Sequence, residues 1–188
     1  MVRWQYRMRI GALAIVVASA SIASAQSVLS DPFGLKVGIL LPTDSNIRGS
    51  FGDAGYDLGV SYIFRDDASQ EDSIDGDYFR IGGSNYFQSI SFGYTGRFFV
   101  SPVATTVDPY LGFSAGISFN RVSAASNGNA ASGGGSSRTT GNQTQPYGEL
   151  IAGVRFTKAA SVEAFYRLTA DLDGFHDNVF GLRLNYKF

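Results

Sequence analysis

Residues 54–64 read AGYDLGVSYIF, and two kinds of side chain alternate along this stretch. Large apolar residues occupy nearly every second position, with glycine, aspartate or serine between them. Successive side chains of a β-strand point to opposite faces. The segment therefore predicts a strand with one apolar face and one small or polar face, a pattern that only Ile63 breaks.

The same alternation recurs seven more times along the chain. The weakest instance is Tyr78–Gly83, where Phe79 and Ile81 are expected on the apolar face and Arg80 on the other. Eight strands result, and a single-chain bacterial barrel has an even number of strands. The predicted strands are Phe33–Leu41, Ala54–Phe64, Tyr78–Gly83, Ile90–Val100, Leu111–Asn120, Glu149–Phe156, Val162–Leu168 and Val179–Phe188.

The composition decides between a soluble sandwich and a membrane barrel. The chain has 188 residues, enough for one domain, and 16% of them are charged, against about 25% in soluble proteins. The polar faces carry glycine and serine with only a few charges, which suits the side-chain-filled interior of an eight-stranded barrel. The apolar faces suit lipid. We predict an all-β fold, an eight-stranded antiparallel up-and-down transmembrane β-barrel.

The N-terminus has the layout of a secretory signal peptide. Three arginines within residues 3–9 precede the apolar run Ile10–Ile22, and the small residues Ala23 and Ala25 stand before Gln26. A retained membrane helix would need about 20 apolar residues, more than this run offers. We expect cleavage after Ala25, which leaves a signal peptide (1–25) and a barrel domain (26–188).

The connections between the strands differ in length and composition. Ser123–Pro146 is rich in Gly, Ser, Asn and Ala and is expected to be mobile. A ten-stranded barrel, with extra short strands in Arg65–Asp77 or Ser101–Pro109, stays open as an alternative. The expected extracellular loops are Pro42–Asp53, Gly83–Asn85, Ser123–Pro146 and Ala170–Asn178, and the expected periplasmic connections are Arg65–Asp77, Ser101–Pro109 and Thr157–Ala160.

A set of charged residues falls on the predicted interior face. Cations outnumber carboxylates in this set, so water or shared carboxylates are expected around Asp57, Glu149 and Glu163, because a buried unpaired charge is costly. The set forms either a gated narrow conduit or a static plug, and we expect the plug. Its members are Lys36, Asp57, Arg80, Arg97, Glu149, Arg155, Glu163, Arg167 and Arg183.

The mature chain resembles the small outer-membrane β-barrel proteins of the OmpA-transmembrane, OmpX and OmpW-like group. The most specific feature is the last strand, whose alternating apolar residues end at the C-terminal Phe188. The resemblance implies that this strand is the signal for the barrel-assembly machinery, carried by Phe180, Leu182, Leu184, Tyr186 and Phe188.

Three motifs in the sequence are candidates for a catalytic or metal site. Some barrels of this kind modify lipid A and need a serine beside a histidine, but the loop around His176 has no serine. The G-x-S-x-G match at Ser114 falls in mid-strand, where a nucleophile elbow cannot form. The acidic segment Asp66–Asp77 lacks the EF-hand spacing. We therefore expect no catalytic residues, no metal and no cofactor.

The function expected from the sequence is a structural or surface-interaction role in the outer membrane of a two-membrane bacterium. A narrow pore for small solutes and a lipid-modifying enzyme are the alternatives. The expected partners are outer-membrane lipid, lipopolysaccharide and, during biogenesis, the barrel-assembly machinery. We expect a monomer, and the net charge of −1 gives no reason to expect nucleic acid.

Overall fold

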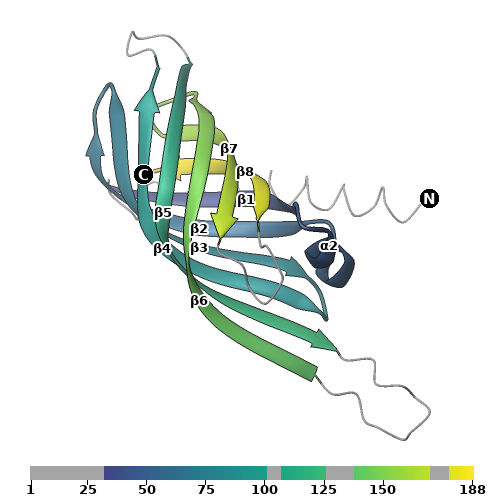
Figure 1. The fold of residues 1–188 in the computed structure, drawn as a ribbon. Coiled ribbons are helices and arrows are strands. Elements are labelled where there is room, and N and C mark those ends of the chain that lie inside the picture. Colours follow the sequence, from purple (N-terminus) through teal and green to yellow (C-terminus); the bar gives the residue numbers. More distant parts are fainter. Residues whose placement is uncertain (1–31, 101–106, 126–137, 170–177) are drawn as a thin grey trace, which may run out of the picture.

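The computed structural model describes residues 32–100, 107–125, 138–169 and 178–188. The signal peptide predicted at 1–25 lies outside these residues. The described residues form eight strands and one short helix, and Figure 1 shows their arrangement. The elements are β1 (Phe33–Pro42), α2 (Ser45–Phe51), β2 (Gly55–Asp66), β3 (Gln70–Gly82), β4 (Tyr86–Phe99), β5 (Asp108–Ala125), β6 (Arg138–Arg155), β7 (Ala160–Thr169) and β8 (Val179–Lys187).

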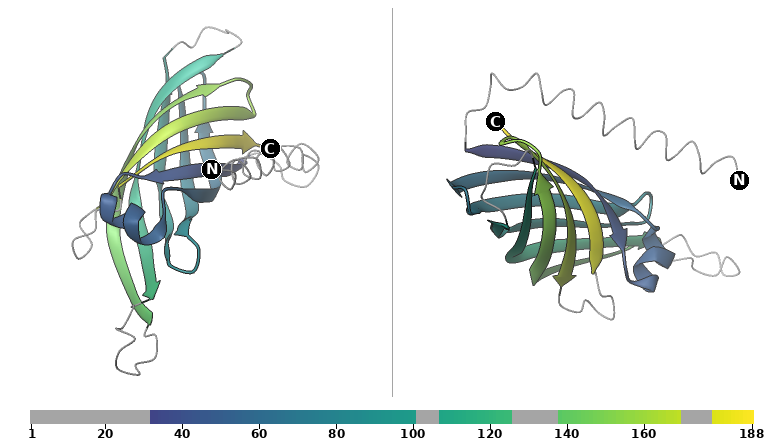
Figure 2. Two further views of the ribbon diagram at one scale, coloured as in Figure 1. Left: turned by 90° about the vertical axis from the view of Figure 1, so that its right-hand side faces the viewer. Right: turned by 90° about the horizontal axis from the view of Figure 1, so that it is seen from above.

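The strands form a closed antiparallel barrel in which each strand pairs with its neighbours in sequence and β8 pairs with β1. The closing seam aligns Val37 with Leu184, and Figure 2 shows the barrel from two further sides. The row of paired residues through Ile39 reaches β6 at Asn142 in one direction and at Ala152 in the other. This ten-residue stagger means that the strands are tilted, as closure of a barrel requires.

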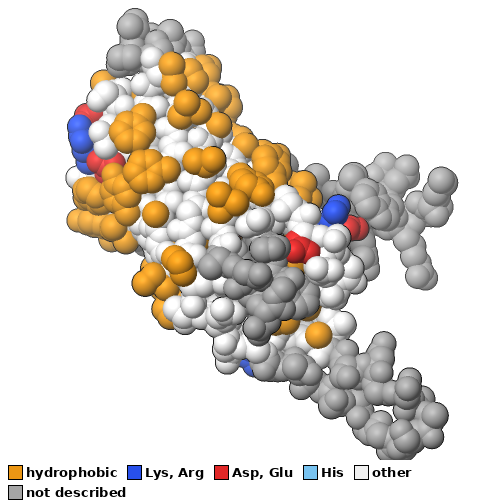
Figure 3. Space-filling view, in the orientation of Figure 1, with side chains coloured by type: hydrophobic (Ala, Val, Ile, Leu, Met, Phe, Trp, Pro, Cys, Tyr) orange, Lys and Arg blue, Asp and Glu red, His pale blue; other side chains and the backbone are white. Residues whose placement is uncertain are grey.

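Outward and inward side chains alternate as the sequence predicts. Apolar side chains on the outside are open, with Val60 exposed to 56% and Leu150 to 63%, and Figure 3 shows them spread over the wall while the charged side chains lie toward its ends. Small residues let the interior close. A Cβ added at Gly181 would overlap the ring of Phe165 that lies across it. The eight-stranded transmembrane barrel fold is therefore confirmed.

The strand β3 corrects two predictions. It begins at Gln70, so the predicted Arg65–Asp77 connection is wrong and the turn is formed by residues 67–69. Within this turn, hydrogen bonds from Ser69 and Arg65 hold the pKa of Asp67 well below its usual range. The predicted face of the strand is also reversed, because Phe79 and Ile81 are 1% and 0% exposed. The ten-stranded alternative is wrong, since the eight described strands already close into a barrel.

The strands β5 and β6 are longer than predicted, at 18 residues each. Both ends of the predicted loop Ser123–Pro146 are strand instead, since Ser123–Ala125 pairs with residues 138–140 and β6 continues through Pro146. Residues 126–137 lie outside the described residues. A tilted strand needs about 9–11 residues to cross a membrane, so this hairpin projects beyond the rest of the barrel, as Figure 1 shows.

The helix α2 lies in the predicted Pro42–Asp53 loop, where no helix was predicted. Asp44 caps it by accepting a hydrogen bond of 2.6 Å from the backbone N–H of Asn46. It ends at Gly52, whose φ of 118° is a conformation that glycine adopts readily. Its buried residues Ile47 and Phe51 face the barrel interior. Among the described residues, no helix is long and apolar enough to cross a membrane.

Candidate functional site

Arg183 on β8 lies at the centre of a charged barrel interior. Its guanidinium donates to Asp57 on β2 through Nε and to Glu149 on β6 through Nη1 at 2.9 Å. Glu163 on β7 lies 3.7 Å from the same Nη1, and the guanidinium carbon sits 3.6 Å from the ring centroid of Phe165. One buried cation thus joins carboxylates from three strands.

A second cluster extends this centre across the barrel. The Nζ of Lys36 lies 2.9 Å from Asp75 and 2.5 Å from Asp77, and both carboxylates come from β3. Arg167 on β7 lies 3.7 Å from Asp77 and 2.6 Å from Glu149. Because Glu149 also binds Arg183, the two clusters form one network.

The network continues toward the end of the barrel that holds both termini. Arg97 on β4 donates to Glu163 at 3.1 Å and to Glu71 on β3 at 3.2 Å. Glu71 lies 3.0 Å from Lys187, whose Nζ also lies 2.6 Å from Asp66. Ion pairs therefore run without a break from Lys36 to the terminal end of the lumen.

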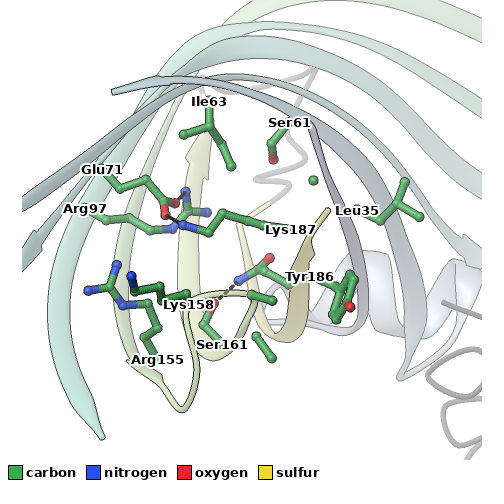
Figure 4. A pocket seen from close by; sticks show the side chains of 14 residues that line it. Leu35, Ser61, Ile63, Glu71, Arg97, Arg155, Lys158, Ser161, Tyr186 and Lys187 are labelled. Carbon is green, nitrogen blue, oxygen red and sulfur yellow. Dashed lines mark hydrogen bonds and ion pairs between the residues drawn. The ribbon is translucent and has the colours of Figure 1, made fainter. Parts of the chain in front are cut away.

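A small pocket opens at this terminal end (Figure 4). Glu71, Arg97, Arg155, Lys158 and Lys187 are among its lining residues, and its volume is about 20 Å³. A single water fills a space of roughly 10–15 Å³ on this measure. The pocket therefore has room for little more than one water molecule.

An apolar plug fills the opposite, loop-bearing end of the lumen. Ile47 and Phe51 of α2 pack there, and aromatic rings meet the charged layer, since the guanidinium carbon of Arg167 lies 4.9 Å from the ring centroid of Phe79. Together the plug and the ion pairs occupy the lumen that the described strands enclose. The other buried residues of the plug include Leu40, Phe79, Ile81, Phe87 and Val179.

Eight of the nine predicted interior charges lie inside the barrel, but the prediction for Arg80 is wrong. Arg80 stands on the outer wall, opposite Tyr56 and Gln88, because the face of β3 is reversed. The eight that lie inside are Lys36, Asp57, Arg97, Glu149, Arg155, Glu163, Arg167 and Arg183.

Sequence reasoning missed three interior carboxylates, Glu71, Asp75 and Asp77. They pair with Arg97, Lys187 and Lys36 and remove the excess of cations that the sequence suggested. A signal was available, because these acids recur at every second or fourth position, which places them on one face of a strand.

Two of the three candidate catalytic or metal motifs, those at Ser114 and Asp66–Asp77, lie within the described residues. Ser114 is buried in mid-strand, with its hydroxyl 3.4 Å from that of Tyr147. The acidic segment Asp66–Asp77 forms the end of β2, the turn after it and the first part of β3, from Gln70 to Asp77. Among the described residues, no group of three or more His, Cys, Asp or Glu side chains could hold a metal ion. His176 lies outside the described residues.

No known family model matches the sequence, and no curated protein is similar to it. Solved structures are similar in fold. The N-terminal β-barrel domain of Pseudomonas aeruginosa OprF matches with a TM-score of 0.55 and 15% identity, over 83% of this chain and 96% of that domain. The outer membrane enzyme PagL matches with a TM-score of 0.56 and 14% identity, over 82% and 99% of the two chains.

Neisserial surface protein A matches with a TM-score of 0.51 and 20% identity, over 83% of this chain and 97% of that one. Identities this low establish likeness of fold alone. The chain has the fold of the small outer-membrane β-barrels, the resemblance that its alternating strands suggested.

Proposed function

We propose that the protein is an integral outer-membrane β-barrel with a structural or surface-interaction role. The observation that carries this proposal is the filled lumen, in which an apolar plug and a continuous ion-pair network lie in series. A pore needs a continuous aqueous path, which this packing opposes. The likeness to outer-membrane barrels and the apolar outer wall support the location.

The projecting β5–β6 hairpin supports the surface role. Longer loops of outer-membrane barrels face outward, and short turns face the periplasm. The hairpin projects from the end opposite the termini (Figure 1), so its residues are the part of the described chain that reaches furthest from the membrane. The partner class that we propose is outer-membrane lipid and lipopolysaccharide, with the protein acting as a monomer.

A conductance experiment separates the closed scaffold from the pore. The mature chain is refolded and added to a planar lipid bilayer, with a porin as positive control. We expect a silent bilayer at high protein load. Steady unitary currents that depend on this protein would overturn the closed-scaffold proposal and favour the narrow pore.

A labelling experiment tests location and orientation. The chain contains no cysteine, so single cysteines report on one position each. Asn142→Cys on the projecting hairpin should react with a membrane-impermeant maleimide in intact cells. Lys158→Cys, in the turn at the terminal end, should react only after permeabilisation, and the reverse pattern would refute the proposed orientation.

A further inference from the structure

One row of outward side chains on the barrel wall is polar and cationic. The strand register places Tyr56, Arg80, Gln88, Arg121 and Asn142 directly opposite one another across β2 to β6. The row contains two guanidinium groups and no carboxylate. Strands are spaced about 4.8 Å apart, so the two arginines start from backbones about 10 Å apart.

Because the strands are tilted, the row climbs toward the loop-bearing end from β2 to β6, and on β2 to β5 it borders the apolar wall. Two residues nearer the terminal end, the outward side chains are Leu58, Tyr78, Ile90 and Phe119 on β2 to β5 and Thr144 on β6. Cationic side chains that border an apolar band lie at the depth of lipid headgroups. Arginine binds phosphate well there, because its planar fork of donors matches two phosphate oxygens.

Arg80 is held in position for such a ligand. Its guanidinium carbon lies 4.5 Å from the ring centroid of Tyr86, and Nη2 donates to the carbonyl of Gly83 at 3.0 Å. A guanidinium has five N–H donors, and this bond uses one of them. Arg121 is exposed on the neighbouring wall. The pair therefore combines an ordered cation with an accessible one.

An apolar groove on the wall of β1 to β4 is lined on β3 as far as Tyr78, two residues from Arg80. It has a volume of about 600 Å³, and its lining includes Leu58, Val60, Tyr78 and Phe92. The groove exists because Gly76, which stands between Val60 and Phe92 in the register, contributes no side chain. Arg80 lies four positions along β3 from Gly76, a distance of about 13 Å along a strand, which an acyl chain can span.

We propose that this wall binds one lipid A headgroup of lipopolysaccharide, with Arg80 and Arg121 contacting its phosphates and the groove around Gly76 receiving an acyl chain. The site rests on the proposed function, since the cationic row faces the outer leaflet only if the loop-bearing end points outward. Charge and shape agree on one ligand class, because Arg80 lies on β3, one of the strands that line the groove, and Arg121 lies on β5, which pairs with the last strand of the groove, β4.

The test measures lipid binding by native mass spectrometry of the refolded mature chain in micelles. Bisphosphorylated lipid A is the probe. We expect Arg80→Gln combined with Arg121→Gln to weaken binding about tenfold or more, because charge-assisted hydrogen bonds to phosphate are lost. Lys158→Gln, an exposed cation at the other end of the barrel, is the matched control and should bind as the wild type does.

A second variant tests the groove without removing charge. A Cβ at Gly76 would lie 3.4 Å or more from its nearest neighbours, so Gly76→Leu fills the groove without displacing the backbone. It should weaken binding severalfold. Ala115→Leu adds the same side chain elsewhere on the outer wall and should not. Unchanged affinity in both the arginine and the Gly76 variants, with normal folding, would overturn the site.

The source of the phosphate is tested with two further lipids. We expect monophosphorylated lipid A to bind more weakly than the bisphosphorylated form. Equal binding of phosphatidylglycerol would overturn the assignment to lipid A. These titrations are made in micelles and do not depend on cellular location, so their failure is distinct from a failure of the labelling experiment.

Discussion

Arg183 shows what a single residue does inside this barrel. It contacts Asp57, Glu149 and Glu163, which come from three other strands. All four side chains are at most 3% exposed. Ions buried to this degree are stable only when their partners are present. The stability of the barrel therefore depends on this arginine far more than on any surface charge.

Arg183→Met should lower the free energy of unfolding by about 3–5 kcal/mol, because three buried carboxylates lose their shared partner. The measurement is urea unfolding in micelles, followed by the loss of the compact band on unboiled gels. Arg65→Met is the control, since Arg65 pairs with Asp67 in solvent and such pairs contribute at most about 1 kcal/mol. A similar loss of unfolding free energy in both variants would contradict the conclusion that the buried ion pairs of Arg183 stabilise the barrel.

At the scale of elements, the helix α2 acts as the cap of the apolar plug. Only two of its side chains, Ile47 and Phe51, are buried. A helix of seven residues is not stable by itself. Its place at the mouth of the barrel therefore depends on these two contacts and on the Asp44 cap.

Phe51→Ala combined with Ile47→Ala should release α2 while the barrel stays closed. Arg48 lies on the exposed side of the helix, so the rate of trypsin cleavage after Arg48 reports the release. We expect cleavage about tenfold faster or more, since large-to-small changes in a core cost about 2–5 kcal/mol each. Ser50→Ala, on an exposed residue of the same helix, should cleave as the wild type does.

The elements also show what the sequence can and cannot predict. Alternation of side chains locates seven strands and their lipid faces, because lipid demands an unbroken apolar face. It says that the two faces of β3 differ without saying which one is inside. The apolar residues Phe79 and Ile81 belong to the interior plug, so a prediction from hydrophobicity alone exchanges the interior and lipid-facing sides of β3.

Two further features needed the structure. The helix α2 is too short to show a helical repeat, although Asp44 is a suitable cap. The ion pairs depend on register across strands, as when Asp57 on β2 meets Arg183 on β8. Residues so far apart in sequence cannot be paired from their spacing. Most of the charged residues of the interior could be predicted from the sequence, but not which of them form ion pairs with one another.

At the scale of the whole molecule, closure of β1 onto β8 is the decisive contact. Leu184 sits in the seam, opposite Val37 on one side and Val162 on the other. A closed barrel has no free strand edge. The pairing of β1 with β8 therefore determines whether the barrel stays closed.

The unboiled protein should migrate faster on a gel than the boiled protein, because the closed barrel stays compact in detergent. Leu184→Pro should abolish the fast band, since proline removes a donor from the ladder in a central strand. Leu184→Val keeps the donor and should retain the band. A fast band in the proline variant would mean that the seam does not hold the barrel shut.

The ion-pair network also constrains how the interior can evolve. A change of one charge leaves a partner buried alone, so tolerated changes must come in compensating pairs, often on strands distant in sequence. Away from the cationic row and the groove around Gly76, the outer wall requires only apolar character, so its residues there can change one at a time. In descendants of one ancestral barrel, the residues of the outer wall would then change quickly, and the charged residues of the interior would change in compensating pairs. Covariation between interior positions would therefore reveal common descent after sequence identity has been lost.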